Sequence, residues 1–327
     1  MTTSSATTLS LPPMGCGTWA WGNRLLWDYQ ETMDSELNAV FDYCVSHGVT
    51  LFDSGDSYGT GKLNGQSEKL LGQFRTAYQG PNAHKICLAT KLAPYPWRLT
   101  RRSMVAAGEA SAQRLGQLNL VQMHWSTANY LPPQEGPLLD GLAELCKQGL
   151  ADGVGLSNYG PKRLHWAHQR LSKQGVKIQT LQVQYSLLST YPVSQLGLKA
   201  VCDELDIQLI AYSPLALGLL TGKYKQKSDI PKGLRRFALG QILPGVHPLL
   251  TCLETVATSR GKTMAQVAIN WCICKGAIPI PGAKTLQQAQ QNVGALGWHL
   301  SAAEVDELDN ASAACRKQMV QNIFQSR

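Results

Sequence analysis

Four ionisable side chains lie at or just past the points where short apolar runs of the chain end. The run at residues 49–54 contains Asp53 and is followed by Tyr58, the run at 85–92 contains Lys91, and the run at 120–125 contains His124. A tyrosine hydroxyl, whose pKa is normally about 10, is a weak acid at neutral pH, but an adjacent ammonium group lowers that pKa. A carboxylate would keep the ammonium charged, and a histidine could hydrogen-bond a substrate oxygen. These residue types could therefore polarise a carbonyl group and protonate its oxygen, with hydride coming from a cofactor.

Each of the four residues also has an ordinary explanation when it is taken alone. An aspartate after a strand, such as Asp53, most often caps a turn or a helix. A lysine such as Lys91 usually extends along the surface. His124 could be a hydrogen-bonded core histidine, and Tyr58 could simply pack. Four such groups at the ends of three runs favour one shared site over these separate explanations.

The elements that would position these residues are apolar or β-branched runs that alternate with amphipathic helical stretches. Eight candidate strands lie at residues 14–20, 49–54, 85–92, 120–125, 153–158, 180–186, 208–214 and 277–282. Helical stretches lie at 35–47, 67–78, 100–115, 138–148, 161–173, 193–206 and 264–275, with two more at 285–296 and 301–312. Because strand and helix repeat without a break in composition, this order predicts an α/β fold.

The length of 327 residues fits two medium domains or one (β/α)8 TIM barrel, which needs about 250 residues plus insertions. Eight strand–helix units favour the barrel over an open, doubly wound sheet. We predict a single barrel domain over residues 1–327, with its core at about 14–310 and extra C-terminal helices. The carboxyl ends of barrel strands share one face, so Asp53, Lys91 and His124 would converge there. We expect the polar residues 316–327 to pack loosely.

Composition and motifs disfavour other classes of protein. The net charge of +8 suits an anionic ligand, but the chain has no nucleic-acid-binding motif, no P-loop and no run of about 20 apolar residues that could span a membrane. The segment that begins at Gly15 loosely matches the dinucleotide-binding fingerprint, but two prolines precede it instead of a strand. Nine cysteines without a Cys-x-x-Cys pair indicate reduced thiols and no metal site. We expect a cytoplasmic protein.

A set of motifs resembles the aldo-keto reductases in both order and spacing. These motifs lie at residues 52–59, 89–91, 122–125, 155–158, 182–186, 211–215 and 280–284, followed by Asn292. The resemblance extends over about residues 15–308 and is strongest to bacterial and plastid-type members, which have a Gly-rich segment after the tyrosine. It implies NADPH-dependent reduction of aldehydes and ketones to alcohols, with hydride from the nicotinamide and a proton from Tyr58. The catalytic tetrad that it implies is Asp53, Tyr58, Lys91 and His124.

The resemblance also implies where an extended NADP(H) molecule would bind. Ser157, Asn158 and Gln182 would contact the carboxamide, and Tyr212 would stack on the nicotinamide ring. Many relatives have Arg at the position of Gln288, so the Gln weakens the selection of NADP(H). Lys284 and the basic segment 223–236 partly restore it, and we expect NADP(H) to be preferred over NAD(H). The pyrophosphate path and the adenosine end would be lined by Ser213, Leu215, Gly218, Lys284, Thr285, Gln288, Gln291 and Asn292.

The substrate would be a small carbonyl compound, since the same resemblance gives His124 where a Glu would favour C=C reduction. We expect a monomer. Two other functions remain open: a nicotinamide-binding sensor with little turnover, and a specialised enzyme such as a pyridoxal or sugar-aldehyde reductase. Packing in the core is the alternative for each aromatic residue that could line the barrel mouth. Those residues are Trp19, Trp21, Trp27 and Trp125.

Overall fold

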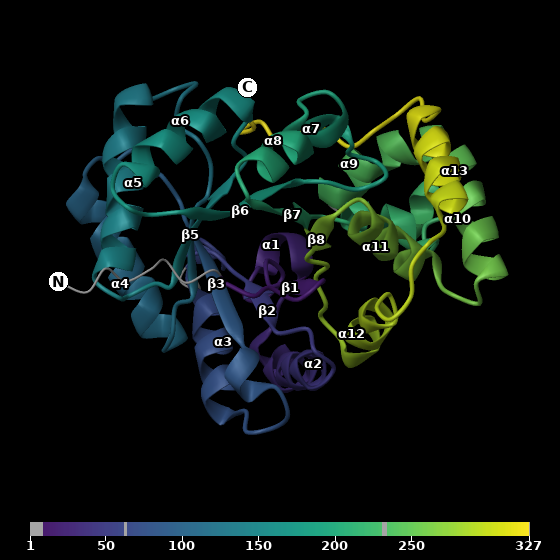
Figure 1. Ribbon diagram of the computed structural model, residues 1–327. Coiled ribbons are helices and arrows are strands. Elements are labelled where there is room, and N and C mark those ends of the chain that lie inside the picture. The colour runs from purple at the N-terminus through teal and green to yellow at the C-terminus, as the bar shows by residue number, and fades with distance from the viewer. Residues whose placement is uncertain (1–8, 62–63, 231–233, 327) are drawn as a thin grey trace.

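Eight parallel strands form the centre of the molecule and confirm the predicted (β/α)8 barrel (Figure 1). The computed structural model describes residues 9–61, 64–230 and 234–326. The strands pair in sequence order, and every neighbouring pair is parallel. Their bounds are β1 (Gly15–Gly17), β2 (Leu51–Asp53), β3 (Cys87–Leu92), β4 (Leu120–Met123), β5 (Gly153–Ser157), β6 (Ile178–Gln184), β7 (Gln208–Tyr212) and β8 (Ala277–Pro279).

Helices surround the strands, as Figure 1 shows. The α-helices are α1 (Arg24–Trp27), α2 (Asp34–Ser46), α3 (Gln66–Ala77), α4 (Arg101–Leu115), α5 (Pro132–Lys147), α6 (Pro161–Ser172), α7 (Tyr191–Ser194), α8 (Leu198–Glu204), α9 (Leu234–Ile242), α10 (His247–Ser259), α11 (Met264–Cys274), α12 (Leu286–Val293) and α13 (Ala302–Ala313). Short 3-10 helices are η1 (Glu31–Met33), η3 (Ala83–Lys85), η4 (Ala216–Thr221), η5 (Lys227–Asp229) and η6 (Leu243–Gly245). The helices α12 and α13 are the extra C-terminal pair that the sequence predicts.

Two glycines in β1 allow the barrel to close against β8. A β-carbon on Gly15 would lie 2.9 Å from Ile280 Cγ2, and one on Gly17 would lie 2.9 Å from the Ile280 carbonyl oxygen. With hydrogen in that place, Gly17 can form a parallel bridge to Gly282, and its amide donates to the Pro281 carbonyl at 3.2 Å. The glycines of this segment therefore serve strand closure, and the fingerprint of a dinucleotide-binding turn is a chance match, as the sequence context indicates.

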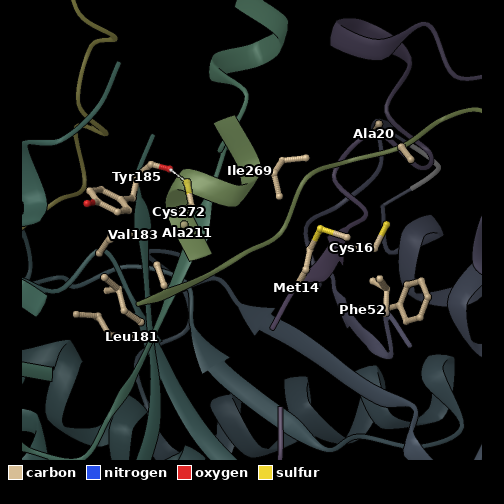
Figure 2. Packing of buried hydrophobic residues seen from close by; sticks show 14 of the residues in the cluster. Met14, Cys16, Ala20, Phe52, Leu181, Val183, Tyr185, Ala211, Ile269 and Cys272 are labelled. Carbon is tan, nitrogen blue, oxygen red and sulfur yellow. Dashed lines mark hydrogen bonds between the residues drawn. The ribbon is translucent and has the colours of Figure 1, made fainter. Parts of the chain in front are cut away.

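The hydrophobic core has one layer between strands and helices and a second layer inside the barrel. Figure 2 shows Leu181 and Val183 of β6 with Ala211 of β7 near Cys272 of α11, all buried in the first layer. Each such large apolar side chain contributes about 1.5–3 kcal/mol when it is fully buried. The inner layer consists of Leu51, Cys87, Ala89, Leu120, Ile210 and Ile280, with Leu9 and Leu11 among the residues packed against it.

The largest differences between expectation and structure concern helices, both within the regular strand–helix units and in an insertion after β7. The predicted stretch 193–206 is two helices, α7 and α8, because Gly197 adopts a left-handed φ of 65° between them. Helix α5 begins at Pro132, six residues earlier than predicted, since proline is favoured in a first helical turn. Helices α9 and α10 follow β7 in a stretch for which the sequence predicts no helix or strand. The insertion between β7 and α11 therefore contains helices of its own.

Three expected absences can be compared with the described residues. Among those residues, no helix is long and apolar enough to cross a bilayer. The same residues contain no cluster of three or more His, Cys, Asp or Glu side chains that could hold a metal ion. All nine cysteines are free thiols, and most of them are buried.

Candidate active site

A cavity of about 820 Å³ opens at the carboxyl ends of the strands, the face on which (β/α)8 enzymes carry their chemistry. All four residues of the predicted tetrad line it, although they come from separate strand ends. Asp53 ends β2, Lys91 lies in β3, and His124 follows the last residue of β4. Tyr58 lies in the loop after β2, where its amide donates to the Gly55 carbonyl at 2.9 Å. The structure thus brings together the four side chains that the sequence places at three strand ends.

The Lys91 ammonium forms a buried ion pair with Asp53 Oδ2. Only 2% of the Lys91 side chain and 3% of the Asp53 side chain are exposed. Burial lowers the pKa of Lys91, but the negative charge of Asp53, with smaller contributions from Tyr58, raises that pKa above its usual value. Lys91 is therefore an ammonium at neutral pH and is held in place by the carboxylate.

Tyr58 and His124 lie around this ion pair in protonation states that suit an acid and a neutral hydrogen-bonding group. Lys91 Nζ is 4.9 Å from the Tyr58 ring centroid, and the Tyr58 and His124 ring centroids are 5.9 Å apart. Burial raises the pKa of Tyr58, and the opposing charge of Lys91 only partly offsets this rise. Burial and the charge of Lys91 both lower the pKa of His124 well below its usual value. At neutral pH, Tyr58 keeps its proton and His124 is uncharged.

Asp53 has two further partners, and one of them, Gln122, lies in a predicted motif but has no predicted role. Gln122 Nε2 and Gln182 Nε2 each donate to Asp53 Oδ1, both at 2.8 Å. The role of Gln122 could have been inferred by counting back two residues from His124, because side chains two apart in a strand face the same side. With the ion pair to Lys91, both carboxylate oxygens have partners.

The residues predicted to surround a nicotinamide line the same cavity and contact one another. Ser157 ends β5, Asn158 follows it, and Tyr212 ends β7. The Tyr212 hydroxyl donates to Asn158 Oδ1 at 2.9 Å. Asn158 Nδ2 donates to the backbone oxygen of His124 at 3.3 Å and to Ser157 Oγ at 3.1 Å. Asn158 has a left-handed φ of 59°, a conformation that asparagine tolerates better than most residues.

The loop after β7 and the start of α12 form the far end of the cavity. Ser213 and Leu217 have left-handed φ values of 53° and 55°, and strained non-glycine backbone of this kind clusters at functional sites. Thr285 does not line the cavity; its hydroxyl accepts from the Gln288 amide at 3.3 Å and caps α12. The other predicted residues that line this end are Leu215, Lys284, Gln288, Gln291 and Asn292, together with Lys223 from the basic segment.

Two of the four candidate tryptophans line the cavity. Trp19 and Trp27 do so, and their rings meet edge to face with centroids 5.8 Å apart. Trp21 is completely buried, and its indole Nε1 donates to the Ala283 carbonyl at 2.9 Å, so it packs in the core. Trp125 does not line the cavity; its ring stacks on Phe324 with centroids 4.5 Å apart.

The segment after α13 packs across this face of the barrel instead of lying loosely, which corrects the expectation for residues 316–327. Asn322 lines the cavity, and its Nδ2 donates to the Tyr212 hydroxyl at 2.9 Å. The Ser326 amide donates to the Asn158 carbonyl at 3.0 Å, and Ser326 Oγ accepts from the Gly160 amide at 2.9 Å. The described part of this tail, 316–326, therefore contacts two of the predicted nicotinamide-binding residues.

Comparison with known proteins identifies the family. The model of the Aldo/keto reductase family matches residues 13–313. The chain belongs to the aldo/keto reductase family. It is 53% identical over 323 residues to a chloroplastic pyridoxal reductase of Arabidopsis thaliana, an alignment that covers 98% of this chain and 88% of the relative.

Solved structures of this family share the fold. A glycerol dehydrogenase from Gluconobacter oxydans matches with a TM-score of 0.79 at 22% identity, covering 98% of this chain and 97% of its own. An aldo/keto reductase from Klebsiella pneumoniae, solved in complex with NADP and acetate, matches with a TM-score of 0.72 at 24% identity and covers 95% of each chain. This oxidoreductase therefore has the same barrel fold as these solved structures.

Proposed function

We propose that this protein reduces aldehydes or ketones to alcohols with NADPH and that Tyr58 donates the proton to the carbonyl oxygen. The observation that carries this proposal is the arrangement of Tyr58, Lys91 and His124 around one end of the cavity. Tyr58 is protonated, Lys91 is charged, and His124 is neutral at neutral pH. A protonated acid beside a fixed positive charge can protonate an oxygen on which negative charge develops.

The shape and lining of the cavity fit an extended nicotinamide dinucleotide. The cavity continues from Tyr58 and His124 past Tyr212 to the first turn of α12. The amino end of a helix attracts phosphate groups, and Lys223 and Lys284 add positive charge on this path. A β-carbon on Gly218 would lie 3.0 Å from Lys223 Cε, so glycine leaves room for the Lys223 side chain in the cavity wall.

Each catalytic side chain has a separate task in the proposed reduction. The bound nicotinamide would supply the hydride that reaches the carbonyl carbon. Tyr58 transfers its hydroxyl proton to the carbonyl oxygen, and the Lys91 ammonium stabilises the phenolate that is left. The neutral His124 hydrogen-bonds the same oxygen and orients it, while Asp53 keeps Lys91 in place. One hydride and one proton thus convert the carbonyl to an alcohol.

A direct test mixes the purified protein with NADPH and a panel of aldehydes and ketones. Turnover lowers the absorbance of the reduced nicotinamide at about 340 nm, a property of the cofactor. We expect consumption of NADPH with at least part of the panel. Tight NADPH binding without turnover of any carbonyl compound would reject the enzyme and support the nicotinamide-binding sensor.

We further propose pyridoxal as a substrate of this site. The support is the relative at 53% identity that is named a pyridoxal reductase. Pyridoxal is a planar aromatic aldehyde, and Trp19 and Trp27 form an aromatic surface on the cavity wall. Aromatic pairs gain about 0.5–1.5 kcal/mol beyond their buried area, so such a ring is a suitable partner for this surface.

The variant Trp19→Ala tests the aromatic surface. It should raise KM for pyridoxal about three- to tenfold, the loss of one aromatic contact, and change KM for acetaldehyde little. Steady-state kinetics with both aldehydes measure the two KM values. Trp97→Ala is the matched control, because Trp97 is 74% exposed and does not line the cavity. Equal effects on both aldehydes would reject an aromatic subsite at Trp19.

The variant Gln288→Arg tests the basis of cofactor preference. The Gln288 side-chain oxygen accepts from the Lys284 amide at 2.8 Å and contributes no charge to the cavity. An arginine could bond a phosphate with charge-assisted hydrogen bonds, so kcat/KM for NADPH relative to NADH should rise about tenfold. Gln290→Arg adds the same charge to an exposed position of α12 and should leave the ratio unchanged. If Gln288→Arg also leaves it unchanged, Gln288 is not near the 2′-phosphate.

A further inference from the structure

A layer of polar side chains fills the upper part of the barrel, where apolar side chains are typical. The interior of a (β/α)8 barrel stacks layers from alternate strands that are rich in Val, Ile and Leu. Here β2, β4 and β6 contribute Asp53, Gln122 and Gln182, whose exposed fractions are 2%, 0% and 2%. Burying polar groups destabilises a fold unless the groups hydrogen-bond one another, so this layer calls for a role that apolar residues could not fill.

The three side chains form a closed set of hydrogen bonds. Gln122 Nε2 and Gln182 Nε2 donate to Asp53 Oδ1, and Gln182 Nε2 also lies 3.3 Å from Gln122 Oε1. Asp53 Oδ2 accepts a hydrogen bond from the Lys91 ammonium. Gln122 thus binds Asp53 through its nitrogen and Gln182 through its oxygen, and it restricts both side chains.

The neighbouring strand leaves room for Gln122. Gly155 of β5 pairs with Gln122 on one side and with Thr180 on the other. A β-carbon on Gly155 would lie 2.9 Å from Gln122 Cγ and 2.3 Å from Thr180 Oγ1. Any larger residue at this position would push the Gln122 side chain away from Asp53. The position of the Gln122 side chain therefore depends on glycine at residue 155.

Gln122 differs from its two partners in its relation to the cavity. Asp53 and Gln182 line the cavity, whereas Gln122 does not. Gln122 can therefore influence a bound molecule only through Asp53 and Gln182. Because the Gln182 nitrogen is engaged with Asp53 and Gln122, its side-chain oxygen is the atom left to accept from a carboxamide N–H.

We propose that Gln122 is a positioning residue that aligns Asp53 with Lys91 and orients Gln182. Through these two contacts, one side chain would influence both the binding of the nicotinamide carboxamide and the position of Lys91 beside the proton donor Tyr58. This inference rests on the proposed function, since it assigns Gln182 to the cofactor and Lys91 to Tyr58. Asp53 held by three donors has one orientation, and that orientation fixes the ammonium beside the Tyr58 ring. Gln182 is part of both the cofactor contact and the Asp53 contact.

The first test replaces Gln122 by Met, which has the same length but cannot donate or accept these hydrogen bonds. Gln122→Met should lower kcat for carbonyl reduction roughly tenfold to a hundredfold, the loss of one hydrogen bond to a charged group. It should also raise the Kd for NADPH severalfold, measured by quenching of tryptophan fluorescence without any turnover. Circular dichroism confirms that the variant is folded.

Thr180→Val is the matched control, because Thr180 lies across Gly155 from Gln122. Thr180 is fully buried, and its hydroxyl has no hydrogen-bond partner in the described part of the chain. The substitution keeps the shape of the side chain and removes no bond to Asp53. We expect kcat and the Kd for NADPH to stay within about twofold of the wild type, because removing this hydroxyl breaks no hydrogen bond and leaves no partner unsatisfied.

A second variant, Gln122→Glu, separates positioning from mere filling of space. At high pH the new carboxylate would face Asp53 and repel it, so activity should be lower than in Gln122→Met. At low pH the protonated Glu can donate an O–H to Asp53 in place of the amide. The ratio of its kcat to that of the wild type should therefore rise as the pH falls from about 8 to about 5.

The outcomes distinguish this inference from the proposed function. A wild-type kcat and NADPH Kd in Gln122→Met would overturn the positioning role, and so would a ratio for Gln122→Glu that does not change with pH. If Tyr58→Phe is inactive while Gln122→Met behaves as the wild type, the proposed function stands and this inference fails. If Tyr58→Phe retains full turnover, the assignment of the proton donor fails first.

Discussion

Replacing Tyr58 by Phe is expected to lower kcat for carbonyl reduction by about 10²–10⁴-fold, the usual contribution of a positioned general acid. The substitution removes the hydroxyl but keeps the ring that lies 4.9 Å from Lys91 Nζ. NADPH binding, followed by tryptophan fluorescence, should remain close to that of the wild type. Single-turnover measurements with saturating NADPH would show the loss in the chemical step itself.

The pH dependence of the wild type provides an independent check on the same assignment. Burial raises the pKa of Tyr58, so the hydroxyl stays protonated through the neutral range. Reduction requires the protonated form and should decline only as the pH rises through that raised pKa. Alcohol oxidation requires the deprotonated form and should increase over the same range. A tyrosine-independent reaction would show neither trend, and full activity of Tyr58→Phe would exclude Tyr58 as the acid.

Replacing Lys91 by Met is expected to reduce both stability and activity. The change removes the positive charge that lowers the pKa of Tyr58, so the phenolate of the proposed reaction would lose its stabilisation. It also leaves the Asp53 carboxylate buried without a counter-charge, which typically costs about 3–5 kcal/mol. Urea unfolding should measure this loss, and kcat should fall by at least about a hundredfold.

The double variant Asp53→Asn, Lys91→Met separates these two effects. An asparagine oxygen can still accept from Gln122 and Gln182, and no buried charge remains. The free energy of unfolding should recover most of the loss, whereas kcat should stay as low as in Lys91→Met. If activity returned with stability, Lys91 would act only through the fold and not on Tyr58.

The sequence predicts the barrel and the tetrad because both follow from local signals. Alternation of short apolar runs with amphipathic helices indicates parallel strands, and parallel strands bring Asp53, Lys91 and His124 to the same face. Helices that depart from this regular alternation cannot be predicted by counting strand–helix units. Helices α9 and α10 lie in an insertion between β7 and α11, outside the units that this alternation predicts.

The remaining parts of the site depend on contacts between residues that are far apart in the sequence. Asn322 reaches Tyr212 across 110 positions, and no periodic pattern in the tail predicts which side chain it meets. Trp21 and Trp125 resemble Trp19 in type and position near strand ends, yet only side-chain packing decides which of them faces the cavity. Gln122 is a different case. The alternation of side chains along its strand predicts that it faces the same side as His124, but it does not predict that Gln122 hydrogen-bonds Asp53 and Gln182.

The two ends of the described chain lie on opposite faces of the barrel. The Leu9 amide donates to Gln179 Oε1 near the start of β6, whereas Ser326 bonds to Asn158 and Gly160 beside the cavity. A bulky label attached at Ser326 would therefore crowd the mouth of the cavity, whereas one attached at Leu9 would stand away from it.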